Sequence, residues 1–239
     1  MPQYSDPELG LIAVTVNARA RRFVFRCRDG QLACTSPAPF SERELCRALN
    51  QLRPKLQELL RKGTEKAQRQ RFTPQTTLDN DSIHIRFQQA DIPAVSARMH
   101  GDDITVSYRS AELLAEDGVQ DWVAQTLEKF ARKRVKACLV PRLLQLAEQR
   151  HLTVSDVKVT SARGRWGSCS SRGSINLSLF LAFLPHHLQD YVLHHELTHR
   201  LEMNHGPRFW QLLDQACGCD SRALRTELRG FTLPGSLAM

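Results

Sequence analysis

The sequence predicts an α+β fold in which a small β-and-helix N-terminal part precedes a larger C-terminal domain. Alternating apolar residues mark strands in the first half of the chain, and apolar residues at helical spacing mark several helices. A chain of 239 residues is long enough for one large domain or two small ones. Residues 109–118 are the best candidate boundary, so we expect an N-terminal region over residues 1–110 and a C-terminal domain over residues 111–239.

The N-terminal part begins with a predicted β-hairpin. Residues 22–28 place Phe23, Phe25 and Cys27 on one face of a strand. The dipeptide Asp29-Gly30 is typical of a two-residue hairpin turn, so residues 31–35 are expected to return as the second strand.

A helix is predicted after the hairpin. Ser41 and Glu44 have the spacing of a capping box, in which the side chain of each residue accepts a hydrogen bond from the backbone N–H of the other. Leucines at helical spacing follow at positions 45, 49, 52, 56, 59 and 60. Pro54 is expected to kink or split this helix, because proline lacks the backbone N–H donor. The polar stretch 63–77 predicts the end of the helix and a loop.

The middle of the chain returns to strands and then to helices. Alternating apolar residues predict strands over residues 82–87 and 103–108. A helix over residues 122–135 follows, and Pro141 should break or kink it before a second helical piece over residues 142–148. A short strand is expected around residues 157–159. No internal repeat is detectable in the sequence.

Composition indicates an ordinary folded protein. With 41% apolar and 24% charged residues, the chain is neither a disordered tail nor a collagen-like fibre. The seven cysteines are odd in number and scattered, which favours reduced thiols over disulfides. We find no secretory pattern and no apolar run near the roughly 20 residues that a membrane span needs. We therefore expect a cytoplasmic protein with no membrane partner.

The charge balance is basic. Lysine and arginine exceed aspartate and glutamate by 33 to 25, a formal net charge of +8. This favours acidic partners, and nucleic acid is one that a basic surface attracts over long range. The basic residues are spread along the chain, however, which is also typical of an ordinary solvated surface.

The strongest chemical signal is the segment 195–199, an HExxH motif. Residues four apart lie on the same face of a helix, so His195 and His199 can bind one metal ion. Glu196 then lies beside the ion, where a carboxylate can take a proton from a water molecule at the metal.

A catalytic zinc site needs a third protein ligand, and His205 is the first candidate. Asn204 can end the helix in the left-handed conformation, and Gly206-Pro207 prevents its continuation, so the chain can turn back toward the ion. Asp214 or Asp220 could supply the third ligand instead. A metzincin is disfavoured, because Glu202 occupies the position of the turn-forming glycine and no methionine turn follows.

These residues form part of a longer ordered pattern. The pattern comprises Arg165-Trp166-Gly167-Ser168-Cys169-Ser170, Ile175-Asn176-Leu177, His195-Glu196-x-x-His199 and Asn204-His205-Gly206-x-x-Phe209-Trp210. It resembles the YgjP-like metallopeptidase family, relatives of the SprT/Spartan zincins, most strongly over residues 159–213. The resemblance implies a zincin-like C-terminal domain, one zinc ion per chain, and a peptide or protein substrate. It also implies His195, His199 and His205 as metal ligands and Glu196 as catalytic base.

Other residues near the motif have less definite roles. Arg165 and Tyr191 are equal candidates for stabilising a reaction intermediate, and the histidines at 186, 187 and 194 could also hydrogen-bond to one. The segment 174–183 could be a buried strand, and it could also offer an exposed edge to which an extended peptide adds. Cys169 is a weak candidate nucleophile, and Cys217-x-Cys219 is a weak candidate for a second metal site.

Two functions from different classes follow from the sequence. The first is a zinc-dependent metallopeptidase that hydrolyses peptide bonds with a metal-activated water and Glu196 as general base. The second is a zinc-stabilised module that binds nucleic acid, with weak or absent proteolysis, or a protease recruited by DNA. A metal-dependent hydrolase of a non-peptide amide is a third possibility. The oligomeric state is left open by the sequence.

Overall fold

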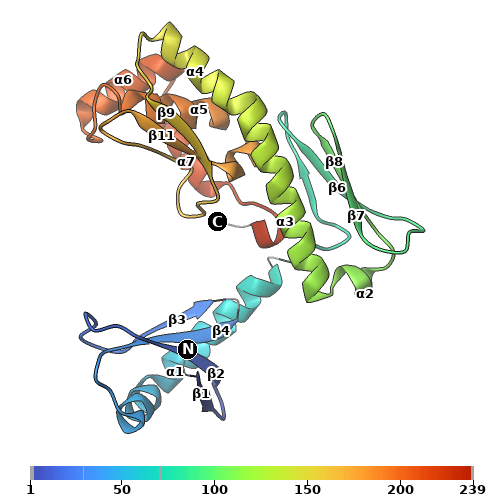
Figure 1. Cartoon of the computed structure of the whole chain (residues 1–239), viewed down its shortest axis with the longest axis vertical. Helices are drawn as coiled ribbons and strands as arrows, with labels where there is room; N and C mark the ends of the chain where they lie inside the picture. Colours follow the sequence, from blue (N-terminus) through green and yellow to red (C-terminus); the bar gives the residue numbers. More distant parts are fainter. Residues whose placement is uncertain (1–2, 29, 70, 238–239) are drawn as a thin grey trace. The chain divides into compact units, whose positions relative to one another are not determined.

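The computed structural model divides into two compact units, residues 1–71 and residues 72–239 (Figure 1). It describes the chain over residues 3–28, 30–69 and 71–237. Helices and three small sheets are present, which confirms the α+β class. No helix in the described ranges combines the length and apolarity needed to cross a membrane.

The first unit is a four-stranded sheet and one long helix. The strands are β1 (Gln3–Asp6), β2 (Gly10–Val16), β3 (Val24–Arg28) and β4 (Gln31–Ser36), in the spatial order β1-β2-β4-β3. Strands β2 and β4 are parallel, and the other two pairs are antiparallel. The helix α1 (Glu42–Arg69) completes a small core with leucines 45, 49 and 56, each at most 4% exposed.

The local predictions for this unit are mostly confirmed. Strands β3 and β4 form the expected hairpin, with Gly30 at a φ of 76°, while Asp29 lies outside the described residues. Ser41 and Glu44 form the capping box, with the Ser41 N–H donating to Glu44 Oε2 at 2.7 Å. The helix is not split at Pro54, because α1 continues through it to Arg69. Packing of the leucine face outweighs the one backbone hydrogen bond that a proline removes.

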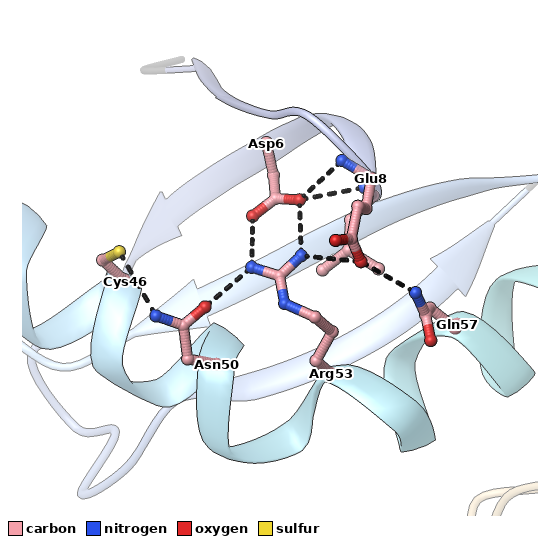
Figure 2. A network of polar contacts seen from close by, with 7 residues as sticks. Asp6, Glu8, Cys46, Asn50, Arg53 and Gln57 are labelled. Atoms are coloured by element: carbon pink, nitrogen blue, oxygen red, sulfur yellow. Dashed lines mark hydrogen bonds and ion pairs between the residues drawn. The ribbon is translucent and has the colours of Figure 1, made fainter.

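An ion pair with a buried carboxylate connects the end of β1 to α1 (Figure 2). Asp6 is 5% exposed, and Arg53 donates two hydrogen bonds to its carboxylate at 3.0 and 3.1 Å. The backbone N–H groups of Glu8 and Leu9 also donate to Asp6 Oδ1, each at 3.0 Å. The hydrogen bonds from Arg53, followed by those from the two backbone groups, lower the pKa of Asp6 although burial opposes the change.

We expect Asp6→Asn to lower the local stability of the first unit by about 1–2 kcal/mol, because hydrogen bonds to a charged group are lost in a buried position. A carboxyl with a lowered pKa stabilises the fold above its unfolded pKa of about 3.9, and this contribution is lost as the pH falls through the folded value. The difference between wild type and variant should therefore shrink below about pH 4. Hydrogen exchange of the α1 amides, measured on the whole chain as a function of pH, gives this difference in local stability. The matched change Glu8→Gln, at an exposed member of the same network, should have no measurable effect.

The second unit begins with a second four-stranded sheet. Its strands are β5 (Thr77–Asp79), β6 (His84–Gln89), β7 (Ser96–His100) and β8 (Asp103–Tyr108), in the spatial order β5-β6-β8-β7. After α2 (Ala111–Leu114), the helix α3 (Asp117–Arg134) contributes Val123, Leu127 and Ala131 to the core that this sheet also lines.

This arrangement places the division of the chain at 71/72, whereas the sequence suggested 110/111. The reason is that the second sheet buries Ile83, Ile85 and Ile104 in the same core as the C-terminal helices. The turn before β6 also holds the chain that leads to the metal-motif helix. Asn80 Nδ2 donates to the Phe183 carbonyl at 3.0 Å, and Ser82 Oγ donates to the Leu184 carbonyl at 2.6 Å.

Both units repeat one topology that the sequence did not reveal. In each sheet an antiparallel pair comes first, its second strand pairs in parallel with the fourth, and the third and fourth form a hairpin. Both hairpins have two-residue turns, with Gly30 and Gly101 at positive φ, and a helix follows each sheet. The two copies therefore share a fold pattern although their side chains differ.

The interruption expected near Pro141 is present, as a π-helical turn rather than a separation into two helices. The helix α3 continues through a π-helical turn, η1 (Val135–Leu139), into α4 (Val140–Gln149), in which Pro141 is the second residue. The ring of a proline in the middle of an α-helix clashes with the carbonyl group four residues earlier. That carbonyl also loses its hydrogen bond, because proline has no backbone N–H. The π-turn changes the bonding pattern at this point and lets the helix proceed.

The rest of the second unit carries the motif. A three-stranded sheet of β9 (Asp156–Thr160), β10 (Gly167–Cys169) and β11 (Ser174–Ser178) precedes the 3₁₀-helix η2 (Leu179–Phe183). The strand order is β10-β11-β9, so the expectation that segment 174–183 is an exposed edge is wrong: β11 is central and η2 is buried. The helices α5 (His186–Thr198), α6 (Pro207–Cys217) and α7 (Ser221–Gly230) follow, and η3 (Gly235–Leu237) ends the described chain.

Candidate metal centre

The helix α5 places two histidines of the motif together. It begins directly after Pro185 and buries Leu188, Leu193 and Leu197 in the core of the second unit. His195 and His199 lie one turn apart, and His199 caps the helix with right-handed backbone angles. Their ring centroids are 5.0 Å apart.

His205 reaches the same place from the loop between α5 and α6. The helix ends at Thr198, and the only described non-glycine residue with positive φ is His151, so the expected left-handed Asn204 is wrong. The chain instead turns immediately after the helix, where the Leu201 and Glu202 N–H groups donate to the Thr198 carbonyl. The indole N–H of Trp210 then holds the His205 carbonyl at 3.1 Å.

The three imidazoles form a set that could hold one metal ion. One nitrogen from each of His195, His199 and His205 lies within 4.8 Å of the others, and the Nε2 atoms of His195 and His205 are 3.1 Å apart. The ring of Phe209 packs against all three, with centroid distances of 4.9, 4.7 and 4.6 Å. His199 Nδ1 lies 3.2 Å from the Glu202 carbonyl, and donation to that oxygen leaves Nε2 as the free acceptor.

The electrostatics of this set fit a cation. Burial, followed by the charges of His199 and His205, lowers the pKa of His195 to about 3. Burial also lowers the pKa values of His199 and His205. The imidazoles are therefore neutral at pH 7, which is the form that binds metal. Two neutral acceptor nitrogens that face each other at 3.1 Å repel unless a proton or a cation lies between them.

Glu196 lies on the buried side of α5. It is 4% exposed, and its Oε2 has no hydrogen-bond partner among the described residues. Burial raises the pKa of Glu196 to about 8, while the charge of Arg165 opposes this rise. Its close neighbour is Gly167 of β10, where an added Cβ would lie 2.6 Å from Glu196 Oε1. Only glycine leaves room for the carboxylate there.

Residues that the sequence left as alternatives have other contacts. Asp214 accepts hydrogen bonds from the N–H and the hydroxyl of Ser221, and Asp220 caps α7. Burial raises the pKa of Cys169, which argues against a reactive thiolate. Cys217 and Cys219 are not part of any possible metal cluster among the described residues.

Of the candidates for stabilising an intermediate, two lie in the pocket beside Glu196 and three do not. Arg165 and Tyr191 both line a pocket that also contains Glu196 and His195. Burial raises the pKa of Tyr191 to about 12, so its hydroxyl keeps its proton and can donate. The candidate histidines 186, 187 and 194 do not line this pocket. His187 contacts Glu227 at 2.6 Å, and His186 lies near Asp81.

A comparison with protein families matches residues 21–230 to "YgjP-like, metallopeptidase domain". The chain belongs to the YgjP-like metallopeptidase family. The family name denotes a metal-dependent hydrolase of peptide bonds, and a three-histidine cluster that could hold a metal ion is present among the described residues. The match extends across both compact units. No curated protein and no solved structure gives a significant match.

Sequence reasoning missed the two charged residues that α7 contributes to this pocket. Arg225 and Arg229 of α7 line it, although they are 30 and 34 positions beyond His195. The available signal was the arginine spacing on a helix, since residues four apart share a face. That signal does not say which surface the face contacts.

Proposed function

We propose that this protein is a zinc-dependent metallopeptidase in which His195, His199 and His205 hold the metal and Glu196 is the general base. The observation that carries the proposal is the convergence of three neutral imidazoles beside a buried carboxylate. Three histidines with an open fourth position are a common ligand set of catalytic zinc. Membership of a metallopeptidase family supports the same chemistry.

Zinc at this site would polarise the scissile carbonyl and make water nucleophilic near neutral pH. The charge of a bound metal would lower the pKa of Glu196 from the value of about 8 that burial gives it, so its carboxylate could accept the proton of the attacking water and return it to the leaving amine. Gly167 allows the carboxylate to lie against the backbone of β10, which restricts its position. The Tyr191 hydroxyl and the Arg165 guanidinium are two donors in the pocket that can stabilise the negative charge on the carbonyl oxygen.

The short strand β10 offers a place for the peptide backbone. It forms one edge of the three-stranded sheet, and its first residue is the glycine that contacts Glu196. An extended peptide that pairs with this edge would bring its carbonyl groups close to the motif helix. This edge replaces the segment 174–183 that the sequence suggested for the same role.

Metal removal tests the proposal. Protein purified without added metal should contain about one zinc ion per chain and should cleave a mixture of unstructured peptides. Dialysis against a chelator should abolish cleavage, and stoichiometric zinc should restore it. Cleavage that persists after the metal is removed would contradict the proposal. Zinc-loaded protein that cleaves nothing but binds DNA, with affinity falling steeply as salt rises, would favour the nucleic-acid module instead.

A further inference from the structure

The pocket beside Glu196 is small and lies at the proposed reaction centre. Its volume is about 290 Å³, close to the lower limit of roughly 300 Å³ for pockets that hold small ligands. Trp166, Val192 and Leu228 supply apolar surface to its lining. A pocket of this size suits one substrate side chain next to the scissile bond.

Three arginines surround this pocket: Arg165, Arg225 and Arg229. Glu196 is the only acidic residue in the lining. None of the three arginines takes part in an ion pair with another described residue. Arg225 lies 5.3 Å from the centre of the Trp210 ring, a contact that holds its side chain without neutralising its charge.

The acidic residue of α7 does not compensate for these charges. Glu227 contacts His187 at 2.6 Å and does not line the pocket. Arg225 and Arg229 are four positions apart, so they lie on the same face of α7. A bound zinc ion would add two further positive charges at the histidines. The three arginines therefore leave the pocket with an excess of positive charge, which the single carboxylate of Glu196 does not balance.

We propose that this pocket receives a carboxylate of the substrate and that Arg165, Arg225 and Arg229 give the enzyme a preference for an acidic residue adjacent to the scissile bond. The inference rests on the proposed peptidase function. Guanidinium groups bind carboxylates through paired hydrogen bonds, and this pairing is strong where water is partly excluded. The carboxylate can belong to an Asp or Glu side chain or to the C-terminus of the substrate.

Matched peptides distinguish these sources. We would measure kcat/KM of the zinc-loaded protein for peptides with Glu or Gln on each side of the cleaved bond, and for the same peptides ending in a free acid or an amide. We expect kcat/KM for the peptide with the carboxylate to be at least about 10-fold higher than for its neutral partner. A factor of ten corresponds to about 1.4 kcal/mol, which one hydrogen bond between charged groups can supply. A preference for Glu over Gln assigns the pocket to a side chain, and a preference for acid over amide assigns it to the C-terminus.

Variants on α7 connect the preference to the pocket. Arg229→Gln should reduce the ratio of kcat/KM between the carboxylate peptide and its neutral partner, and Arg229→Glu should shift preference toward a Lys peptide. Arg222→Gln is the matched control, because Arg222 is on the same helix but packs on Trp210 and does not line the pocket. The ratio should be unchanged in this variant.

The results separate this inference from the proposed function. Equal cleavage of carboxylate and neutral peptides by wild type would overturn the inference and leave the peptidase intact. If no peptide is cleaved, calorimetric binding of the same peptides still decides: tighter binding of the carboxylate form supports the pocket, and equal binding overturns it. If a short single-stranded DNA displaces the acidic peptide at a concentration below that of the peptide, the arginines bind phosphate groups and the carboxylate proposal is overturned.

Discussion

Glu196→Gln is expected to lower kcat by at least about 100-fold while one zinc ion per chain remains bound, because general acid–base catalysis contributes typically about 10²–10⁴ in rate. Glutamine has nearly the same size and shape as glutamate, so it leaves no cavity at a position that is 4% exposed. It cannot accept and return the proton that the proposed mechanism requires. Peptide hydrolysis and metal content, measured on one preparation, check both parts of this result.

The matched control for this variant is Glu202→Gln. Glu202 follows the motif closely, but its backbone carbonyl, and not its carboxylate, faces His199 Nδ1. Its Oε1 accepts a hydrogen bond from the Asn204 N–H, which a glutamine oxygen can also do. We expect this variant to keep its zinc and most of its activity. If Glu196→Gln hydrolyses peptides as fast as wild type with zinc bound, Glu196 is not the general base.

Local rules allowed much of the motif region to be predicted. His195 and His199 are one helical turn apart, so the geometry of any α-helix places them on one face. His205 follows after a short loop that Pro207 closes, because the next helix begins at this proline. The capping box at Ser41 and the hairpin at Gly30 are equally local. Each of these features depends on residues no more than ten positions apart.

Features that depend on distant contacts could not be predicted in this way. The strand β11 is central because β9 and β10 both pair with it, and neither pairing is visible from its alternation alone. Leucine packing in the core keeps α1 intact through Pro54, whereas an isolated helix of the same sequence has no such contacts. The arginines of α7 reach the pocket because α6 and α7 fold back on α5. The division at 71/72 likewise reflects a core shared between residues more than 90 positions apart.

His205→Ala is expected to weaken zinc binding by more than the roughly 10- to 100-fold that loss of an outer-shell partner costs, because it removes a ligand itself. His195 and His199 alone offer two nitrogens, and four-coordinate zinc would then need two further ligands from solvent. The Trp210 bond to the position 205 carbonyl does not depend on the imidazole, so the loop should keep its path. Zinc affinity, measured by competition with a coloured chelator, checks this result for wild type and variant.

The control addresses the acids that could replace His205. Asp220→Asn removes a carboxylate but keeps a side-chain oxygen that caps α7, since asparagine and aspartate are comparable at this position of a helix. It should leave zinc affinity unchanged if His205 is the third ligand. Asp214 is already bonded to Ser221 by two hydrogen bonds of 2.9 and 2.6 Å, so recruiting it to the metal would break both. If His205→Ala keeps its zinc and Asp220→Asn loses it, Asp220 at the start of α7 is the third ligand and His205 is not.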